Sequence, residues 1–267
     1  MPTPYADLNA VLAELVSGAR EILGENFVGA YLQGSFAVGD ADEHSDVDFL
    51  VVVHDELTDA QQAALKALHE RLYAIDTPWA QHLEGSYVPE RQLRRVSPER
   101  QPWFYFDNGA TEPIWDNHDN SAVVRWSLRE HGVALAGPEP KTLVDPISAA
   151  EIRADALVAV AEWEEWLPTL DSWSARLQPL VVLSYCRILN TLESCVVMSK
   201  RQAGEWALGA LDDPWRELIQ QALDDRPDPW SKVRRPANPE AVARTRAFVE
   251  YASGLARRYE GTRSAAR

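Results

Sequence analysis

The chain has 267 residues, of which 46% are hydrophobic and 25% are charged, and its formal net charge is −15 at pH 7. This length suits one large domain or two ordinary ones, and the composition is that of a globular protein. The negative charge argues against binding to nucleic-acid phosphates, which needs a surplus of cations, and favours a cationic small-molecule partner. No run of about 18 apolar residues occurs, so we expect no membrane span and a cytoplasmic location.

The first half of the sequence alternates helical and strand patterns. Apolar residues recur every three or four positions across 5–23, which predicts an amphipathic helix that ends at Gly24. Strands are predicted over 27–34, 47–53 and 80–89, and helices over 57–73 and 121–131, with a loop-rich stretch across 90–120. A short extended piece follows Gly132. We therefore expect an α+β domain whose small mixed sheet is flanked by helices.

From about residue 150 onward every strong pattern is helical. Helices are predicted over 149–167, over about 173–195, after Ser199 and after Asn238. Ser148 and Glu151 stand at capping-box spacing before the first of these helices. The sequence therefore predicts a first domain over 1–148 and an all-α helical bundle domain over 149–267.

Two aspartates stand at the head of the second predicted strand, in the stretch YLQGSFAVGDADEHSDVDFLVVV at 31–53. Because side chains in a strand alternate between its faces, Asp46 and Asp48 project together. Two carboxylates this close repel each other unless a cation neutralises them. Carboxylate oxygens suit Mg²⁺, which also accepts substrate phosphates as ligands. The pair therefore predicts a site for one or two Mg²⁺ ions.

A glycine and a serine precede the two aspartates, separated from them by ten loop residues. Gly34 permits a tight turn and a close approach to a ligand. Ser35 offers a hydroxyl and a backbone N–H to a phosphate, and Ser45 offers the same groups beside the metal. Either motif alone is a weak signal, since such residues are more often caps or solvated loop residues. Placed together between two apolar strands, they favour a phosphate and metal site.

This spacing resembles the G-S…D-x-D signature of the DNA polymerase β-like nucleotidyltransferase superfamily. That superfamily supplies a third carboxylate from a later strand. The resemblance implies Glu84, in HLEGSYVP, as this carboxylate, both a metal ligand and the general base. Asp76 is the competing candidate, but it stands in a predicted turn beside Pro78.

Two later stretches resemble the aminoglycoside adenylyltransferases that act on streptomycin and spectinomycin. They are LREHGVALAGP at 128–138 and VVLSYCRILNTLESCVVMSKRQAGEWAL at 181–208. The resemblance implies ATP as co-substrate, with Arg187 and Lys200 near its triphosphate. The residues alone favour a structural ion pair for Arg187 and a surface position for Lys200.

The same family holds its cationic, hydroxyl-rich substrate with aromatic and acidic side chains. The resemblance implies Trp103 or Tyr105 as the aromatic contact, and Asp119 or Asn120 as an acidic or polar contact. Leu177 stands near a position where the family has an acid, which puts streptomycin itself in question.

The expected activity is the Mg-dependent transfer of AMP from ATP to a hydroxyl of an aminoglycoside-type antibiotic, carried out by a monomer. The alternatives are transfer to another small molecule or to a protein side chain, or a non-catalytic nucleotide-binding relative.

Overall fold

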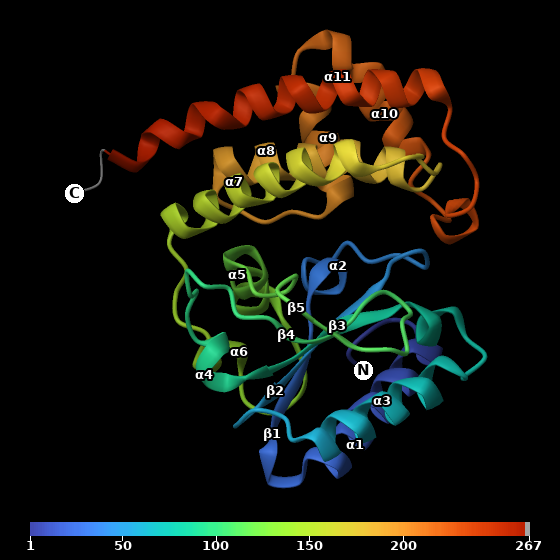
Figure 1. Cartoon of the computed structure of the whole chain (residues 1–267), viewed down its shortest axis with the longest axis vertical. Coiled ribbons are helices and arrows are strands. Elements are labelled where there is room, and N and C mark those ends of the chain that lie inside the picture. Colours follow the sequence, from blue (N-terminus) through green and yellow to red (C-terminus); the bar gives the residue numbers. More distant parts are fainter. Residues whose placement is uncertain (265–267) are drawn as a thin grey trace. The chain divides into compact units, whose positions relative to one another are not determined.

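The structure is a computed structural model that describes residues 1–264. The chain divides into two compact units, Met1–Ile147 and a second unit that begins at Ser148. The first unit combines a sheet with helices, and the second contains helices throughout its described elements (Figure 1). The predicted fold class, an α+β unit followed by an all-α unit, is confirmed.

The first unit is built on a six-stranded mixed sheet with strand order β5-β4-β3-β2-β1-β6. Its strands are β1 (Phe27–Leu32), β2 (Val47–Val53), β3 (Leu83–Pro89), β4 (Trp103–Phe106), β5 (Ile114–Asp116) and β6 (Val133–Ala136). β2 and β3 run parallel, and the other neighbouring pairs run antiparallel. The parallel pair lies at the centre of the sheet, where both faces are covered.

Helices cover both faces of this sheet. The helices of the first unit are α1 (Ala6–Leu23), α2 (Gly34–Ala37), α3 (Asp59–Tyr73), α4 (Glu90–Leu93), α5 (Ala122–His131) and α6 (Pro140–Leu143). On one face, α1 and α3 pack their apolar side chains against Phe49, Val51 and Val53 of β2. On the other face, α4, α5 and α6 contribute leucines that pack with Leu50 and Val52. The alternating residues of β2 therefore separate the two apolar layers.

The described part of the second unit is a bundle of five longer helices. They are α7 (Ala149–Trp166), α8 (Leu177–Ser194), α9 (Lys200–Ala210), α10 (Arg216–Asp224) and α11 (Pro239–Ala256). α8 contacts the other four helices, and thirteen of its eighteen residues are buried. It is therefore the central helix of this unit, and its nearly all-round burial explains why its sequence is apolar on more than one face.

Several predicted element ends are confirmed by their capping geometry. Gly24 ends α1 with a φ of 55°. Thr58 before α3, and Ser148 before α7, each form a complete capping box with the residue three positions later. Asn238 caps α11 by accepting a hydrogen bond from the Glu240 backbone N–H.

Several elements differ from the sequence-based predictions. The stretch 90–120, expected to be loop, contains α4, β4 and β5. β4 was missed because its four residues are all buried and show no alternation. The nine-residue helix α10 was not predicted. α8 begins at Leu177 rather than near 173, because residues 173 and 175 instead hydrogen-bond to the backbone of 235–237.

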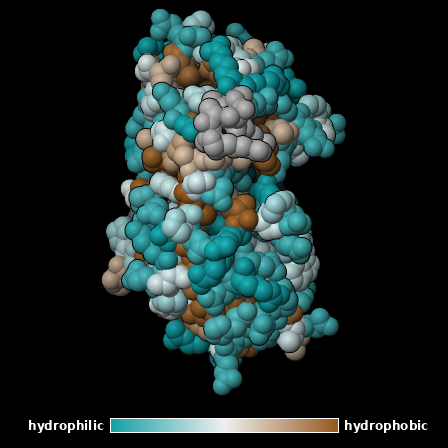
Figure 2. All heavy atoms as spheres, turned by 90° about the vertical axis from the view of Figure 1, so that its left-hand side faces the viewer, coloured by the Kyte–Doolittle hydropathy of each residue, from teal (hydrophilic) through white to brown (hydrophobic). Residues whose placement is uncertain are grey.

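Polar side chains dominate the surface that Figure 2 shows, and hydrophobic residues appear there in small separate groups. None of the helices within residues 1–264 combines the length and the apolar character needed to cross a bilayer.

Candidate active site

Three carboxylates meet at the head of the parallel strand pair of the first unit. The register of β2 and β3 sets Asp48 directly beside Glu84, and Asp46 lies two residues before Asp48. One carboxylate oxygen from each of the three residues lies within 4.8 Å of the others, and all three residues are half-buried. Carboxylates at this spacing repel one another unless a cation lies between them. The three residues therefore fit a divalent cation with oxygen ligands, such as Mg²⁺. The competing candidate, Asp76, is exposed and lies outside this cluster.

The first turn of helix α2, which contains residues 34 and 35, lies against this carboxylate cluster. Gly34 has a φ of +57°, and a Cβ atom at this position would lie 1.8 Å from Asp48 Oδ2. The backbone N–H of Gln33 donates a 2.9 Å hydrogen bond to the Asp48 carbonyl. The position therefore requires glycine both for its backbone conformation and for the space beside the carboxylate.

Ser35 presents a hydroxyl that is buried and has no hydrogen-bond partner among the described residues. A buried polar atom without a partner is costly, so this hydroxyl fits a ligand that supplies an acceptor, such as a phosphate oxygen. Ser45 differs, because its hydroxyl accepts a 3.0 Å hydrogen bond from the Asp42 N–H and donates to Asp42 Oδ1 at 3.2 Å. These bonds close the loop that leads into β2.

Glu84 has a defined set of partners. Its side chain is 14% exposed, and the Tyr105 hydroxyl donates a 2.6 Å hydrogen bond to its Oε1. His118 Nε2 lies 3.5 Å from the same oxygen. Burial and the neighbouring Asp46 charge raise the pKa of the Glu84 carboxyl, while His118 and Tyr105 oppose this rise. A carboxyl group with a raised pKa beside a metal-type cluster suits a general base.

Asp119 connects the turn at residues 34 and 35 with β3. It is 5% exposed, and its two oxygens accept hydrogen bonds from Gln33 Nε2 at 3.0 Å and from Ser86 Oγ at 2.7 Å. Burial raises the pKa of the Asp119 carboxyl, while the His118 charge and these two donors oppose the rise. Sequence reasoning missed Gln33, Ser86 and His118. Ser86 carried one signal, since it stands two residues after Glu84 and therefore on the same face of β3.

The two aromatic candidates for substrate contact lie on β4. Trp103 is 1% exposed, its indole N–H donates to Gln92 Oε1 at 2.9 Å, and the Arg125 guanidinium lies 5.1 Å from the centre of its ring. The structure thus corrects the expectation for Trp103, which belongs to the core of the first unit. Tyr105 is 4% exposed, and its hydroxyl is already committed to Glu84.

The remaining predicted residues lie in the second unit. Arg187 is half-buried on α8. Lys200 is the first residue of α9, directly after Ser199, whose hydroxyl accepts from the Gln202 N–H at 3.0 Å. Leu177 opens α8 and packs against the apolar core of the second unit.

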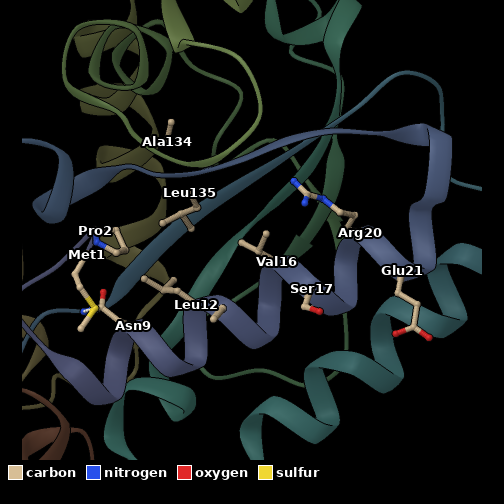
Figure 3. Close-up of a pocket in the computed structure, with 11 residues that line it drawn as sticks. Met1, Pro2, Asn9, Leu12, Val16, Ser17, Arg20, Glu21, Ala134 and Leu135 are labelled. Atoms are coloured by element: carbon tan, nitrogen blue, oxygen red, sulfur yellow. Dashed lines mark hydrogen bonds between the residues drawn. The ribbon is translucent and has the colours of Figure 1, made fainter.

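A separate hollow of about 840 Å³ lies in the first unit between α1 and β6. Figure 3 shows Leu12, Val16 and Arg20 of α1 on one side of it and Leu135 of β6 on the other. None of the predicted site residues lines it, so its position gives no support to a role in the expected chemistry.

Comparisons with known protein families match both units. Residues 16–93 match the nucleotidyltransferase domain model, and residues 142–252 match the model of the aminoglycoside adenylyltransferase C-terminal domain. Spectinomycin 9-adenylyltransferase from Staphylococcus aureus is 28% identical over 206 residues, which cover 72% of this chain and 75% of the relative. Aminoglycoside (3'') (9) adenylyltransferase from Shigella flexneri is 26% identical over 230 residues, which cover 81% of this chain and 84% of the relative.

The fold is also similar to that of a solved structure, spectinomycin adenyltransferase AAD(9) from Enterococcus faecialis, which was crystallised with ATP and spectinomycin. The two share 15% sequence identity with a TM-score of 0.73, and the match covers 93% of this chain and 98% of that one. Both units of the chain therefore resemble those of the aminoglycoside adenylyltransferases, with a nucleotidyltransferase domain in the first unit.

Proposed function

We propose that the chain transfers AMP from ATP to a hydroxyl group of an aminoglycoside-type antibiotic. The observation that carries this proposal is the cluster of Asp46, Asp48 and Glu84 beside the turn at residues 34 and 35. The carboxylate cluster and the adjacent turn suit this chemistry, because the triphosphate must be bound and its negative charge neutralised while the acceptor hydroxyl is deprotonated. The names of the relatives support the choice of acceptor class. Because its co-substrate is ATP, we place the reaction in the cytoplasm.

In this proposal Asp46, Asp48 and Glu84 hold one or two Mg²⁺ ions. Bound there, Mg²⁺ would neutralise negative charge on the triphosphate and on the departing pyrophosphate. The Ser35 hydroxyl, which lacks a partner among the described residues, would donate to a phosphate oxygen. Arg187 and Lys200 stay the remaining predicted contacts to the nucleotide, whereas the hydroxyl and the backbone N–H of Ser45 are bonded to Asp42. Positioning and electrostatics would then supply most of the rate acceleration.

Glu84 acts as the general base in this mechanism. Its carboxylate takes the proton from the acceptor hydroxyl, whose oxygen forms a bond to the α-phosphorus of ATP as the bond to pyrophosphate breaks. The products are the adenylylated acceptor and pyrophosphate. The half-buried position of Glu84 suits this step, because partial desolvation brings the pKa of a carboxyl group closer to neutrality.

We propose spectinomycin ahead of streptomycin as acceptor. The supporting observation is Leu177, a partly buried residue that packs against the core of the second unit and that stands near the position where the family resemblance implies an acid. A leucine offers no charge to the cationic groups of an acceptor, so this position does not favour streptomycin, the more highly charged of the two antibiotics. Spectinomycin also appears in the names of several relatives.

The proposal is tested by measuring pyrophosphate release from ATP in the presence of Mg²⁺ and a panel of aminoglycosides. We expect turnover with spectinomycin, an adenylylated product in mass spectrometry, and no turnover with Asp48→Asn. ATP turnover that requires a different small molecule or a protein acceptor would keep the nucleotidyltransferase chemistry and overturn the proposed substrate. Equal turnover with streptomycin would overturn the argument from Leu177.

A further inference from the structure

We propose that Tyr105 is a positioning residue, which holds the Glu84 carboxylate in the orientation needed for proton transfer and makes no contact with the acceptor. This inference rests on the proposed function, in which Glu84 is the general base. It replaces the expectation from the family resemblance that Tyr105 touches the substrate.

The sheet places the two side chains on one face. β3 and β4 pair antiparallel with Ser86 opposite Tyr105. Glu84 lies two residues before Ser86 and thus points to the same side, as a diagonal neighbour of Tyr105. The reach of a tyrosine covers this diagonal distance, and its hydroxyl lies 2.6 Å from Glu84 Oε1. An O–H···O⁻ bond of this length is in the range of charge-assisted hydrogen bonds.

The side chain of Tyr105 is held in place by its surroundings, whereas the longer side chain of Glu84 needs a partner to hold it in one conformation. The tyrosine is 4% exposed and lies on β4, which pairs with β3 on one side and β5 on the other. A tyrosine has two soft torsions, and a glutamate has three. The more rigid side chain therefore sets the position of the more flexible one. Burial also leaves Tyr105 little surface for a bulky acceptor.

His118 contacts the same carboxylate oxygen from the solvent side. Its ring lies 5.5 Å from the ring of Tyr105, and its Nε2 lies 3.5 Å from Glu84 Oε1. Its side chain is 61% exposed, so Tyr105 is the fixed partner of the two. Both contacts go to Oε1, so neither of these two partners occupies Oε2.

The test removes only the hydroxyl, with Tyr105→Phe. We expect kcat to fall about 10- to 100-fold, since a catalytic group displaced by about 1 Å loses up to that much, while KM for ATP changes by less than about twofold. In a Glu84→Gln background the same change should cost less than about twofold, because Tyr105 then has no base to position. An equal loss in both backgrounds would show that Tyr105 acts on the substrate or the fold, and would overturn the inference.

Tyr87→Phe is the matched control. Tyr87 is also a buried tyrosine of this sheet, 1% exposed, and its hydroxyl bonds to His69 Nε2 at 3.0 Å. It lies three residues after Glu84 and so on the opposite face. We expect its loss to lower the melting temperature and to leave kcat unchanged. A fall in kcat equal to that of Tyr105→Phe would assign the effect to general packing.

A second measurement keeps the inference separate from the proposed function. In crystal structures of the wild-type chain and of Tyr105→Phe, we expect Glu84 in one conformer in the first and displaced or in several conformers in the second. An unchanged Glu84 overturns the inference, whatever the activity. Absence of AMP transfer by the wild-type chain overturns the proposed function, and the structural comparison still decides the role of Tyr105.

Discussion

Replacing Gly34 by alanine tests the link between the turn at residues 34 and 35 and the carboxylate cluster. A Cβ atom there would lie 1.8 Å from Asp48 Oδ2, whereas real Cβ atoms stay at least 3.0 Å from their neighbours, so the two must separate by about 1.2 Å. A displacement of about 1 Å at a reacting centre costs on the order of 100-fold in rate, or about 2.7 kcal/mol of transition-state stabilisation. The positive φ of 57° adds about 1–2 kcal/mol of backbone strain.

Gly39→Ala separates these two effects. Gly39 lies in the loop that follows α2 and has a φ of +71°, but a Cβ atom there has no neighbour within 4 Å. Both variants should therefore lose a similar amount of unfolding free energy to backbone strain. We expect only Gly34→Ala to lose about 100-fold in AMP transfer, measured as pyrophosphate release. Equal activity in the two variants, with both folded by circular dichroism, would refute the reasoning that Gly34 makes room for Asp48.

Three further predictions follow from the same geometry. Asp46→Asn combined with Asp48→Asn should abolish AMP transfer with little change in the melting temperature, and retained turnover would refute the metal site. Glu84→Gln should still bind ATP in calorimetry while kcat falls by about two to four orders of magnitude; normal turnover would exclude it as the base. Burial lowers the pKa of His69 to about 3, below the value of about 6.5 in an unfolded chain. His69 therefore takes up a proton on unfolding. The free energy of unfolding should fall by about 1.4 kcal/mol for each pH unit as the pH is lowered from about 6.5 to about 3. Urea titrations of the wild-type chain and of His69→Phe should show this difference in slope, and parallel pH dependences would contradict it.

The sequence predicted those parts of the fold whose signal is local. The capping pair at Ser148 and Glu151 predicted the start of α7, because the geometry of a capping box is completed within four residues. β4 was missed because WFYF is short and apolar throughout, so it shows neither alternation nor turn residues, and only its pairing with β3 identifies it. α10 was missed because a nine-residue helix carries too few turns for a firm periodicity, and it is held by packing against α8.

The residues of the candidate site likewise divide into those that a local sequence pattern predicts and those that depend on contacts distant in the sequence. Asp46 and Asp48 could be predicted to share a face from the period of a strand alone. Glu84 needed the parallel register of β2 and β3, which the sequence does not display and which the family resemblance supplied. The partners of Glu84 could not be predicted from the sequence, since Tyr105 lies on the unpredicted β4 and His118 lies in the loop before α5.

Asp119 illustrates why a residue's type and family position do not fix its role. The resemblance implied a contact between its carboxylate and a cationic acceptor, yet both of its oxygens already accept hydrogen bonds, one from Gln33 and one from Ser86. Gln33 leads directly into the turn at residues 34 and 35, and Ser86 shares a strand face with Glu84. Through these two bonds the buried carboxylate joins the phosphate side of the proposed site to the side of the general base. Removing it would leave two buried donors without partners and loosen both sides together, so a loss of acceptor binding in an Asp119 variant would not by itself identify a substrate contact.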